Sequence, residues 1–314
     1  MLRLRFLNVA EGDSILIEDI EDTQVFRLLV DTGRDIVSSA APCASCAEHL
    51  RAFGVDRLDQ VLITHLHIDH VGGLMNVLEN VRVGTILCGF VPLSPGRHFD
   101  PSPKSEKQVR GLAQCLNLWS DCVRFARDRG IGTRELFASW TGVRLTPRLT
   151  ADFILPDITT ARIQREVYNA VLDGQKLPEE KIVRASRMRN PNSLRARLYY
   201  AGRQIELSGD CYGTVWEHDD FAPCDILKVP HHGDAKSVTK TLARKLRPKH
   251  SVICCAKDYV PAKDRPSMEA ARLLRQTGSK VWYTDAYQEG DLPPRSVPST
   301  DFTITEEGRI LPPR

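Results

Sequence analysis

THLHIDHVGG, residues 64–73, continues directly from a strand-like apolar stretch. It places three imidazoles and a carboxylate within six positions, and these groups are the usual ligands of zinc and similar divalent ions. His65 and His67 are two residues apart and would face the same side of an extended segment, whereas Asp69 and His70 fall in the turn that follows. Structural zinc sites favour closed, cysteine-rich tetrahedra. The open His and Asp set therefore predicts a catalytic metal site rather than a structural ion or a polar loop.

Strand-like and helix-like patterns alternate on both sides of this run, which predicts an α/β layered architecture. Strands are expected at 4–9, 14–18, 26–31, 59–64, 83–88, 195–200, 204–208, 225–229, 251–255, 280–283 and 301–305. Helices are expected at 43–53, 107–129 and 236–246, and again after the N-cap residue Ser267, with Gly278 just past the end.

The stretch at about 92–185 begins with an irregular, proline-containing loop and then shows helix-like and strand-like pieces. We interpret residues 1–314 as a single domain in which this stretch is an elaboration of the core. The same insert is a candidate contact surface for a protein partner.

Composition narrows the class of protein. The formal net charge of +3 is too small to indicate a polyanion partner by itself. The apolar runs are much shorter than the ~20 residues that cross a bilayer, and the N-terminus resembles a strand rather than a signal peptide. We therefore expect a cytoplasmic protein with no membrane partner. The nine cysteines have no regular spacing and are expected to be mostly reduced; Cys43 and Cys46 have redox or zinc-ligand spacing, but two half-buried thiols are favoured because no second such pair exists.

An HxHxDH run after an apolar strand resembles the signature of the metallo-β-lactamase superfamily. Three further motifs resemble the hydrolase domain of ComEC-type competence proteins and their soluble relatives: FLNVAEGDS at 6–14, LSGD at 207–210 and KVPHHG at 228–233. The similarity covers about residues 1–90 and 190–285. It implies a four-layer αββα metallo-β-lactamase fold and a metal-dependent hydrolase.

The resemblance also implies a centre for one or two divalent ions, zinc or manganese with magnesium as a further candidate. Its ligands would be His65, His67, Asp69, His70, Asp210 as the bridging carboxylate, and one of His231 and His232. His231 is favoured because it lies nearer the strand end, with His232 behind it. Asp31 would orient a metal-bound histidine. Asp69 and Asp210 are the predicted catalytic carboxylates, since Asp69 can also accept a proton from the attacking water.

Two departures from the superfamily pattern are visible. No histidine precedes the LSGD motif where a third ligand to the first ion is usual; Arg189-Asn190-Pro191-Asn192-Ser193 stands there instead. An asparagine such as Asn192 beside the ions is a hard oxygen donor and would favour manganese or magnesium over zinc. Arg265 replaces a common histidine before a proline, and it is either a bidentate phosphate clamp or a solvated loop residue.

The stretch 181–205 carries seven basic residues and no acidic residue. The next acidic residue is Glu206. If residues 190–193 border the ions, the arginines would rim the site and attract a polyanion, with Arg189 and Ser193 contacting substrate. Alternatively, Arg195 and Arg197 line the solvated face of a strand.

Three functions remain open from the sequence. The first is a phosphodiesterase, favoured as a nuclease acting on DNA, which would use a water activated by the ions. The second is a hydrolase of a small ester, thioester or phosphorylcholine-type substrate, because one fold supports many chemistries. The third is a catalytically weak regulatory module in a larger assembly.

Overall fold

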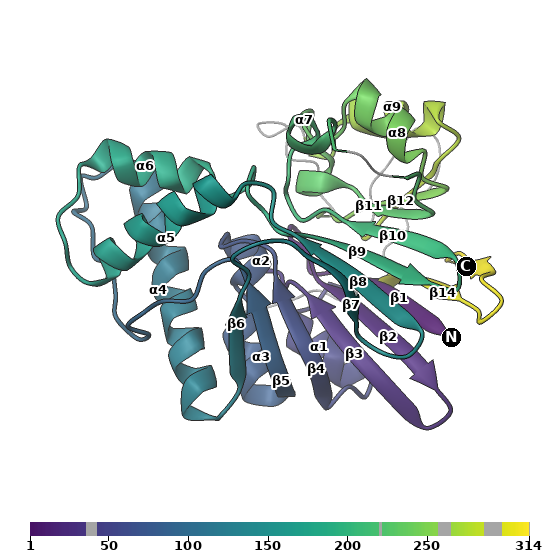
Figure 1. Ribbon diagram of the computed structural model, residues 1–314, viewed down its shortest axis with the longest axis horizontal. Coiled ribbons are helices and arrows are strands. Elements are labelled where there is room, and N and C mark those ends of the chain that lie inside the picture. Colours follow the sequence, from purple (N-terminus) through teal and green to yellow (C-terminus); the bar gives the residue numbers. More distant parts are fainter. Residues whose placement is uncertain (36–42, 220–221, 257–264, 286–296, 314) are drawn as a thin grey trace.

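The computed structural model describes residues 1–35, 43–219, 222–256, 265–285 and 297–313. Within these ranges the strands form two mixed sheets that lie face to face (Figure 1). Helices α1 and α3 lie on the outer side of the first sheet, and α7, α8 and α9 on the outer side of the second. The predicted four-layer αββα architecture is confirmed.

The first sheet contains eight strands among the described residues. In spatial order they are β15 (Ile310–Leu311), β14 (Ser299–Ile304), β1 (Leu2–Leu7), β2 (Ile15–Glu21), β3 (Gln24–Val30), β4 (Arg57–Ile63), β5 (Arg82–Cys88) and β6 (Gly132–Glu135). Strands β3 to β6 pair in parallel, whereas β15, β14, β1, β2 and β3 pair antiparallel in turn. The carboxyl ends of β3 and β4 therefore meet at one edge of the sheet.

The second sheet contains seven strands in the same described part of the chain. In spatial order they are β13 (Lys280–Tyr283), β12 (His250–Ile253), β11 (Ile226–Lys228), β10 (Arg203–Leu207), β9 (Arg195–Tyr200), β8 (Leu149–Ile154) and β7 (Trp140–Arg144). Strands β10 to β13 are parallel, so the loops that leave β10 and β11 also emerge at one edge.

The helices are grouped by the sheet that they cover. On the side of the first sheet lie α1 (Cys46–Ala52), α2 (Ile68–Val71), α3 (Leu74–Asn80), α4 (Lys107–Asp128), α5 (Ile158–Leu172) and α6 (Glu179–Arg187). The second sheet carries α7 (Gly213–Trp216), α8 (Lys240–Leu246), α9 (Met268–Gln276) and the 3-10 turn η1 (Pro230–Gly233). None of the helices in the described ranges combines the length and the hydropathy that a bilayer crossing requires.

Three apolar cores hold the four layers together, and the alternation along each strand distributes side chains between them. On β4, Val61 and Ile63 pack toward the helices, whereas Leu62 points into the space between the sheets. On β11, Ile226 joins the core between the sheets and Leu227 joins the core under α8 and α9. Both sheets are thus buried on both faces, which explains why their central strands read as continuous apolar runs.

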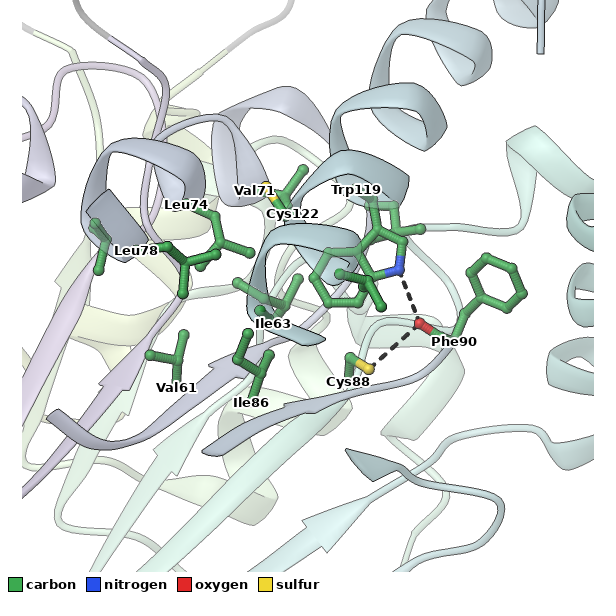
Figure 2. Close-up of a cluster of buried hydrophobic side chains, with 14 of the residues drawn as sticks. Val61, Ile63, Val71, Leu74, Leu78, Ile86, Cys88, Phe90, Trp119 and Cys122 are labelled. Carbon is green, nitrogen blue, oxygen red and sulfur yellow. Dashed lines mark hydrogen bonds between the residues drawn. The ribbon is translucent and has the colours of Figure 1, made fainter. Parts of the chain in front are cut away.

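The insert is packed into this architecture. Figure 2 shows Trp119 and Cys122 of α4 against Ile63 and Ile86 of the first sheet. The Trp119 indole donates a hydrogen bond to the carbonyl oxygen of Phe90 at 2.9 Å, so the ring buries its area and satisfies its N–H. Strand β6 pairs with β5, and β8 pairs with β9. Residues of the insert therefore contribute strands to both sheets.

Candidate metal centre

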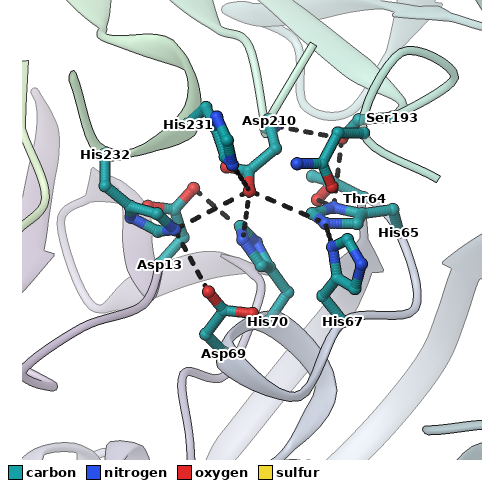
Figure 3. A network of polar contacts seen from close by, with 12 residues as sticks. Asp13, Thr64, His65, His67, Asp69, His70, Ser193, Asp210, His231 and His232 are labelled. Carbon is teal, nitrogen blue, oxygen red and sulfur yellow. Dashed lines mark hydrogen bonds and ion pairs between the residues drawn. The ribbon is translucent and has the colours of Figure 1, made fainter. Parts of the chain in front are cut away.

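The histidine run lies at the edge where the two sheets meet, and loops from both sheets contribute to it (Figure 3). The first sheet provides Asp13 before β2, Asp31 after β3, and the run His65, His67, Asp69 and His70 after β4. The second provides Asp210 after β10, and His231 and His232 in η1 after β11. The chain turns tightly there: a Cβ on Gly73 would lie 2.5 Å from the carbonyl oxygen of Thr32, so only glycine allows this approach.

A first group of candidate ligands consists of His65, His67 and Asp210. His65 Nε2 lies 2.8 Å from His67 Nδ1 and 3.7 Å from Asp210 Oδ2. Burial lowers the pKa of His65 well below its usual value, and burial together with the Arg189 charge lowers the pKa of His67 to about 3. Both imidazoles are therefore neutral at neutral pH, with lone pairs available to a metal ion.

Ser193 positions two members of this group. Its hydroxyl lies 3.2 Å from His65 Nδ1 and accepts a hydrogen bond from the Asp210 backbone N–H at 3.2 Å. The Thr64 hydroxyl lies 3.1 Å from the same His65 nitrogen. Ser193 was expected to contact substrate, but the geometry places it behind the ligands because it is fully buried.

A second group consists of Asp69, His70 and His232. His70 Nδ1 donates to Asp31 Oδ2 at 2.8 Å, which leaves Nε2 facing Asp210 Oδ2 at 3.2 Å. Burial disfavours the charged form of His70, but Asp210 and Asp31 outweigh it and raise the pKa of His70 well above its usual value. Burial raises the pKa of Asp31. Asp31 lies where the sequence predicted an orienting carboxylate.

His231 and His232 both approach Asp210, at 3.9 and 3.7 Å from its Oδ2, and His232 also lies beside a second candidate ligand, Asp69. His232 Nδ1 lies 3.1 Å from the Cys254 carbonyl oxygen, and its Nε2 lies 3.4 Å from Asp69 Oδ2. His231 has its Nδ1 2.5 Å from Asp234 Oδ2 and its Nε2 against the Arg265 guanidinium. Among the described residues, the groups able to hold an ion include His232 and not His231. The sequence favoured His231 because it lies nearer the strand end. Both histidines have left-handed φ angles, of 47° and 55°, so distance from the strand end does not decide which one turns toward Asp69.

Asp210 connects the two groups. Its Oδ2 lies 3.7 Å from His65 Nε2, 3.2 Å from His70 Nε2 and 3.7 Å from His232 Nε2 (Figure 3). Within the described part of the chain, His70 Nε2, His232 Nε2 and Asp210 Oδ1 are buried and have no hydrogen-bond partner. Buried polar atoms without partners are costly. The donor set therefore fits divalent cations, with Asp210 placed to bridge them.

Two buried charges in the centre were not assigned a role from the sequence, although both lie in motifs that the sequence analysis quoted. Asp13 is 1% exposed and Lys228 is 0% exposed. Their side chains form an ion pair, and Lys228 Nζ also lies 3.7 Å from Asp210 Oδ1. The sequence does not indicate that Asp13 of the GDS motif contacts Lys228 before VPHHG, because the two residues lie in segments that belong to different sheets.

The loop 189–193 borders the centre but does not present the side chains that were expected. Arg189 is buried and donates from Nη1 to the Leu66 carbonyl oxygen at 2.7 Å and from Nη2 to Ser186 Oγ at 3.0 Å, so it braces the histidine run instead of reaching out to substrate. Asn192 accepts from the Asp157 N–H and donates to Gln164, away from the ligands. Asn190 Oδ1 is the amide oxygen of this loop that is buried without a partner among the described residues.

The six basic residues of 181–205 other than Arg189 divide into two sets. Arg195, Arg197 and Arg203 form ion pairs with Asp219, Glu206 and Asp225, respectively. Arg195 is buried and its guanidinium lies over the Trp216 ring, so neither the predicted basic rim nor the alternative of a solvated strand face describes it.

The second set consists of Lys181, Arg184 and Arg187, which are exposed on α6. Helix α6 leads directly into the loop 189–193 at the centre.

Arg265 lies at the centre and is not a solvated loop residue. Its side chain is 15% exposed, contacts His231 and lies 3.5 Å from Glu11 Oε1. A cavity behind His65, lined by Gln164, Tyr168 and Arg189 among others, has a volume of about 40 Å³. This space suits one or two water molecules rather than a bound small substrate.

No cysteine belongs to the groups of candidate metal ligands among the described residues. All nine are free, eight of them are buried, and Cys43 is half-buried. Cys46 is fully buried in α1 and accepts a hydrogen bond from Ser14 Oγ at 3.2 Å; burial raises its pKa to about 12. Cys43 and Cys46 are therefore not a matched pair of half-buried thiols.

Comparison with protein families matches residues 8–257 to the family model described as the Metallo-beta-lactamase superfamily. ComE operon protein 3 of Bacillus subtilis (strain 168) is 22% identical over 294 residues, which cover 89% of this chain and 31% of that protein. Anti-Pycsar protein Apyc1 of Bacillus phage 010DV004 is 38% identical over 58 residues, covering 18% of this chain and 20% of that protein. The matched part thus spans about a third or less of either relative.

Three solved structures illustrate the structural similarity. The metallo-beta-lactamase fold protein YhfI from Bacillus subtilis is 10% identical with a TM-score of 0.42, covering 90% of this chain and 96% of that one. Zn(2+)-bound PqqB from Methylobacterium extorquens is 11% identical with a TM-score of 0.42, covering 90% and 98%. CmlA, a diiron beta-hydroxylase from Streptomyces venezuelae, is 13% identical with a TM-score of 0.44, covering 90% and 52%.

Proposed function

Because this chain belongs to the metallo-beta-lactamase superfamily, in which metal-dependent hydrolases predominate, we propose that it hydrolyses phosphodiester bonds and that its substrate is nucleic acid, DNA in the first instance. The observation that carries the proposal is the position of Asp210, whose Oδ2 faces both groups of candidate ligands. Two divalent ions held there would lower the pKa of a coordinated water and neutralise charge on the attacked phosphorus.

The chain's own residues have distinct tasks in this proposal. His65, His67 and Asp210 would hold one ion, and Asp69, His70 and His232 would hold another, with Asp210 within reach of both. Asp69 is 13% exposed, whereas Asp210 is 1% exposed, so Asp69 is the carboxylate that can pass a proton from the attacking water toward solvent. Burial opposes ionisation of Asp69, but the nearby His232 and His70 side chains outweigh it and hold the pKa of Asp69 well below the usual value.

Arg265 and His231 are assigned to the phosphate. The Arg265 guanidinium lies against His231 Nε2, and that nitrogen is 3.9 Å from Asp210 Oδ2. A guanidinium in this place can donate two hydrogen bonds to the non-bridging oxygens of a phosphodiester. Asp234 on the other ring nitrogen keeps His231 turned toward the same region.

A polymeric anion is favoured over a small ester by the surface beside the centre. Lys181, Arg184 and Arg187 are exposed on α6, at positions three residues apart that share one helix face. These side chains would follow a phosphate backbone that leaves the centre along α6.

Manganese is the proposed ion, with zinc as the alternative. The chain has no third histidine before the bridging aspartate, and the buried Asn190 Oδ1 without a partner is the oxygen available from that loop. A neutral oxygen donor favours manganese or magnesium relative to an imidazole. Asn190→His should therefore raise zinc affinity relative to manganese affinity, measured by calorimetry with each ion.

The reducing interior of the cytoplasm is the proposed location, because nine free thiols, eight of them buried, suit a compartment in which disulfides are rare. The insert remains a candidate surface for a protein partner.

The test is cleavage of single-stranded DNA, duplex DNA, RNA and bis(p-nitrophenyl) phosphate by protein loaded with manganese, magnesium or zinc. His67→Ala and Asp210→Ala should abolish turnover. The double variant Arg184→Ala/Arg187→Ala should raise the KM for polymers. The slope of log(kcat/KM) against log(salt concentration) should become smaller by about 0.7 for each single-strand phosphate contact that is lost. Hydrolysis of bis(p-nitrophenyl) phosphate should not change. The matched control is Arg57→Ala/Arg82→Ala, two exposed arginines at the far ends of β4 and β5. Full metal loading without cleavage of any phosphodiester would contradict the proposal.

A further inference from the structure

Lys228 is a buried cation inside a centre that is built to hold cations. It is the last residue of β11, its side chain is 0% exposed, and its ammonium forms an ion pair with Asp13. Nζ also donates to the Gly209 carbonyl oxygen at 2.8 Å and lies 3.7 Å from Asp210 Oδ1. An isolated ammonium in this place would be strongly disfavoured, so the carboxylates of Asp13 and Asp210 account for its retention.

The charge stays on the lysine. Its ammonium forms an ion pair with the Asp13 carboxylate and lies 3.7 Å from Asp210 Oδ1, and two carboxylates at these positions favour the charged form of the lysine. The Cys254 thiol also faces this ammonium, and burial raises the pKa of that thiol well above its usual value, so it is neutral. The positive charge at Nζ is thus a permanent part of the centre.

The position of Nζ coincides with a third set of candidate ligands. Asp13, His70 and Asp210 are close enough to one another to hold an ion. Lys228 already contacts both carboxylates of that set. A divalent ion and an ammonium cannot share these oxygens without strong repulsion.

We propose that Lys228 is a built-in cation that occupies the Asp13–Asp210 carboxylates, keeps metal ions out of that position and fixes which Asp210 oxygen faces the metal centre. Asp210 Oδ1 is turned toward Nζ and Oδ2 toward the histidines. Lys228 is a positioning residue, because it acts through Asp210.

The proposal and a purely structural role for Lys228 predict opposite changes in metal affinity when Lys228 is removed, because of the charges around the centre. Four carboxylates surround the centre: Asp13, Asp31, Asp69 and Asp210. Lys228 offsets one of these negative charges, so removing it should make the centre more attractive to divalent ions. If Lys228 only supported the fold, its loss would loosen the ligands and weaken metal binding.

The experiment measures manganese affinity by calorimetry and bound metal by elemental analysis, in four forms of the full chain. Lys228→Met should bind manganese about tenfold more tightly or retain an additional ion. Asp13→Asn leaves the ammonium without its carboxylate and should weaken binding by a similar factor. Asp13→Asn/Lys228→Met restores the net charge and should bind close to the original protein.

The matched control is Arg197→Met, which also breaks a buried ion pair, with Glu206, in the second sheet. It should lower stability and leave metal affinity unchanged. If Lys228→Met fails to fold, the proposal is tested by comparing Asp13→Asn with the double variant. The double variant should bind manganese more tightly than Asp13→Asn, because it lacks the unpaired ammonium. Weaker or equal metal binding by folded Lys228→Met, or no recovery in the double variant, would overturn the proposal.

The inference rests on the metal centre and not on the proposed substrate. Metal affinity is read without any turnover, so a chain that cleaves no phosphodiester can still confirm the role of Lys228. Conversely, an active enzyme with unchanged affinity in Lys228→Met would reject this inference alone.

Discussion

The Oδ2 atom of Asp31 lies 2.8 Å from Nδ1 of His70, and both side chains are 0% exposed. The second Asp31 oxygen accepts the Thr64 backbone N–H at 2.8 Å. Asp31 therefore fixes at once the ring orientation of His70 and the end of β4 from which the histidine run begins. A ligand held from behind in this way binds metal with its geometry already set.

Asp31→Asn tests this relationship. An amide cannot stabilise the His70 ring as a carboxylate does, so metal affinity should fall about 10- to 100-fold. The measurement is manganese and zinc affinity by calorimetry, with circular dichroism as a check on the fold. Asp157→Asn, which alters the N-cap of α5 far along the chain from the ligands, is the control and should bind metal normally.

The two adjacent histidines should separate in their effects. His232→Ala removes a ligand that faces Asp69, so the second ion should be lost or weakened by at least about tenfold. His231→Ala removes a side chain that contacts Arg265 and should retain metal while losing turnover. Elemental analysis after gel filtration distinguishes the two, and loss of metal from His231→Ala with retention in His232→Ala would reverse the assignment.

Metal binding should release a proton near neutral pH. The raised pKa of His70 means that the metal-free protein carries a proton there, which the ion must displace. The lowered pKa values of His65 and His67 mean that these rings have none to lose. Affinity should therefore rise with pH through the neutral range. Calorimetry in two buffers with different ionisation enthalpies should report about one proton per protein, and heats independent of the buffer would contradict this.

Trp119→Ala should destabilise the whole chain. The indole is 0% exposed and packs in the core between α4 and the first sheet. Its removal should lower the free energy of unfolding by about 3–5 kcal/mol, because a large cavity is left and the Phe90 carbonyl loses its donor. Denaturant unfolding measures the change. A small effect, with α4 unfolding separately, would show that the insert is not integral to the core.

The thiols provide an independent check on burial. Cys43 is half-buried and the other eight cysteines are buried. A thiol reagent should therefore modify about one cysteine quickly in the native protein and all of them after denaturation. Cys43→Ser should remove the fast reaction. Several fast thiols in the native state would contradict the packing of α1, α4 and β5 described above.

The alternation of strands and helices predicted an α/β layered fold, and the resemblance to the metallo-β-lactamase superfamily implied its four layers and most of the residues at the centre. The histidine run and Asp210 lie at strand ends that the alternation of apolar residues predicts. The length of α4 and the bounds of β13 were also close to expectation. Helices α5 and α6 were not predicted; α6 packs against both α4 and α5.

The remaining differences arise from contacts between distant segments. The charge of Arg195 or Arg197 is visible in the sequence, but the carboxylates of Asp219 and Glu206 that offset it are not assigned by spacing. The same holds for Asp13 and Lys228. Two consecutive non-glycine residues with left-handed backbone are rare, because this conformation costs about 1–2 kcal/mol for each residue. The sequence around His232 therefore did not predict that its side chain turns toward Asp69.

The division of the centre between two sheets also has a consequence for the time at which it forms. During synthesis the histidine run leaves the ribosome while Asp210 and His232 have yet to be made, and the second sheet is completed only by β12 and β13. A nascent chain therefore carries exposed imidazoles that have no fixed partners. The metal centre can form only after the second sheet, which carries Asp210 and His232, has packed against the first. Metal-dependent activity is therefore expected only from the fully folded chain.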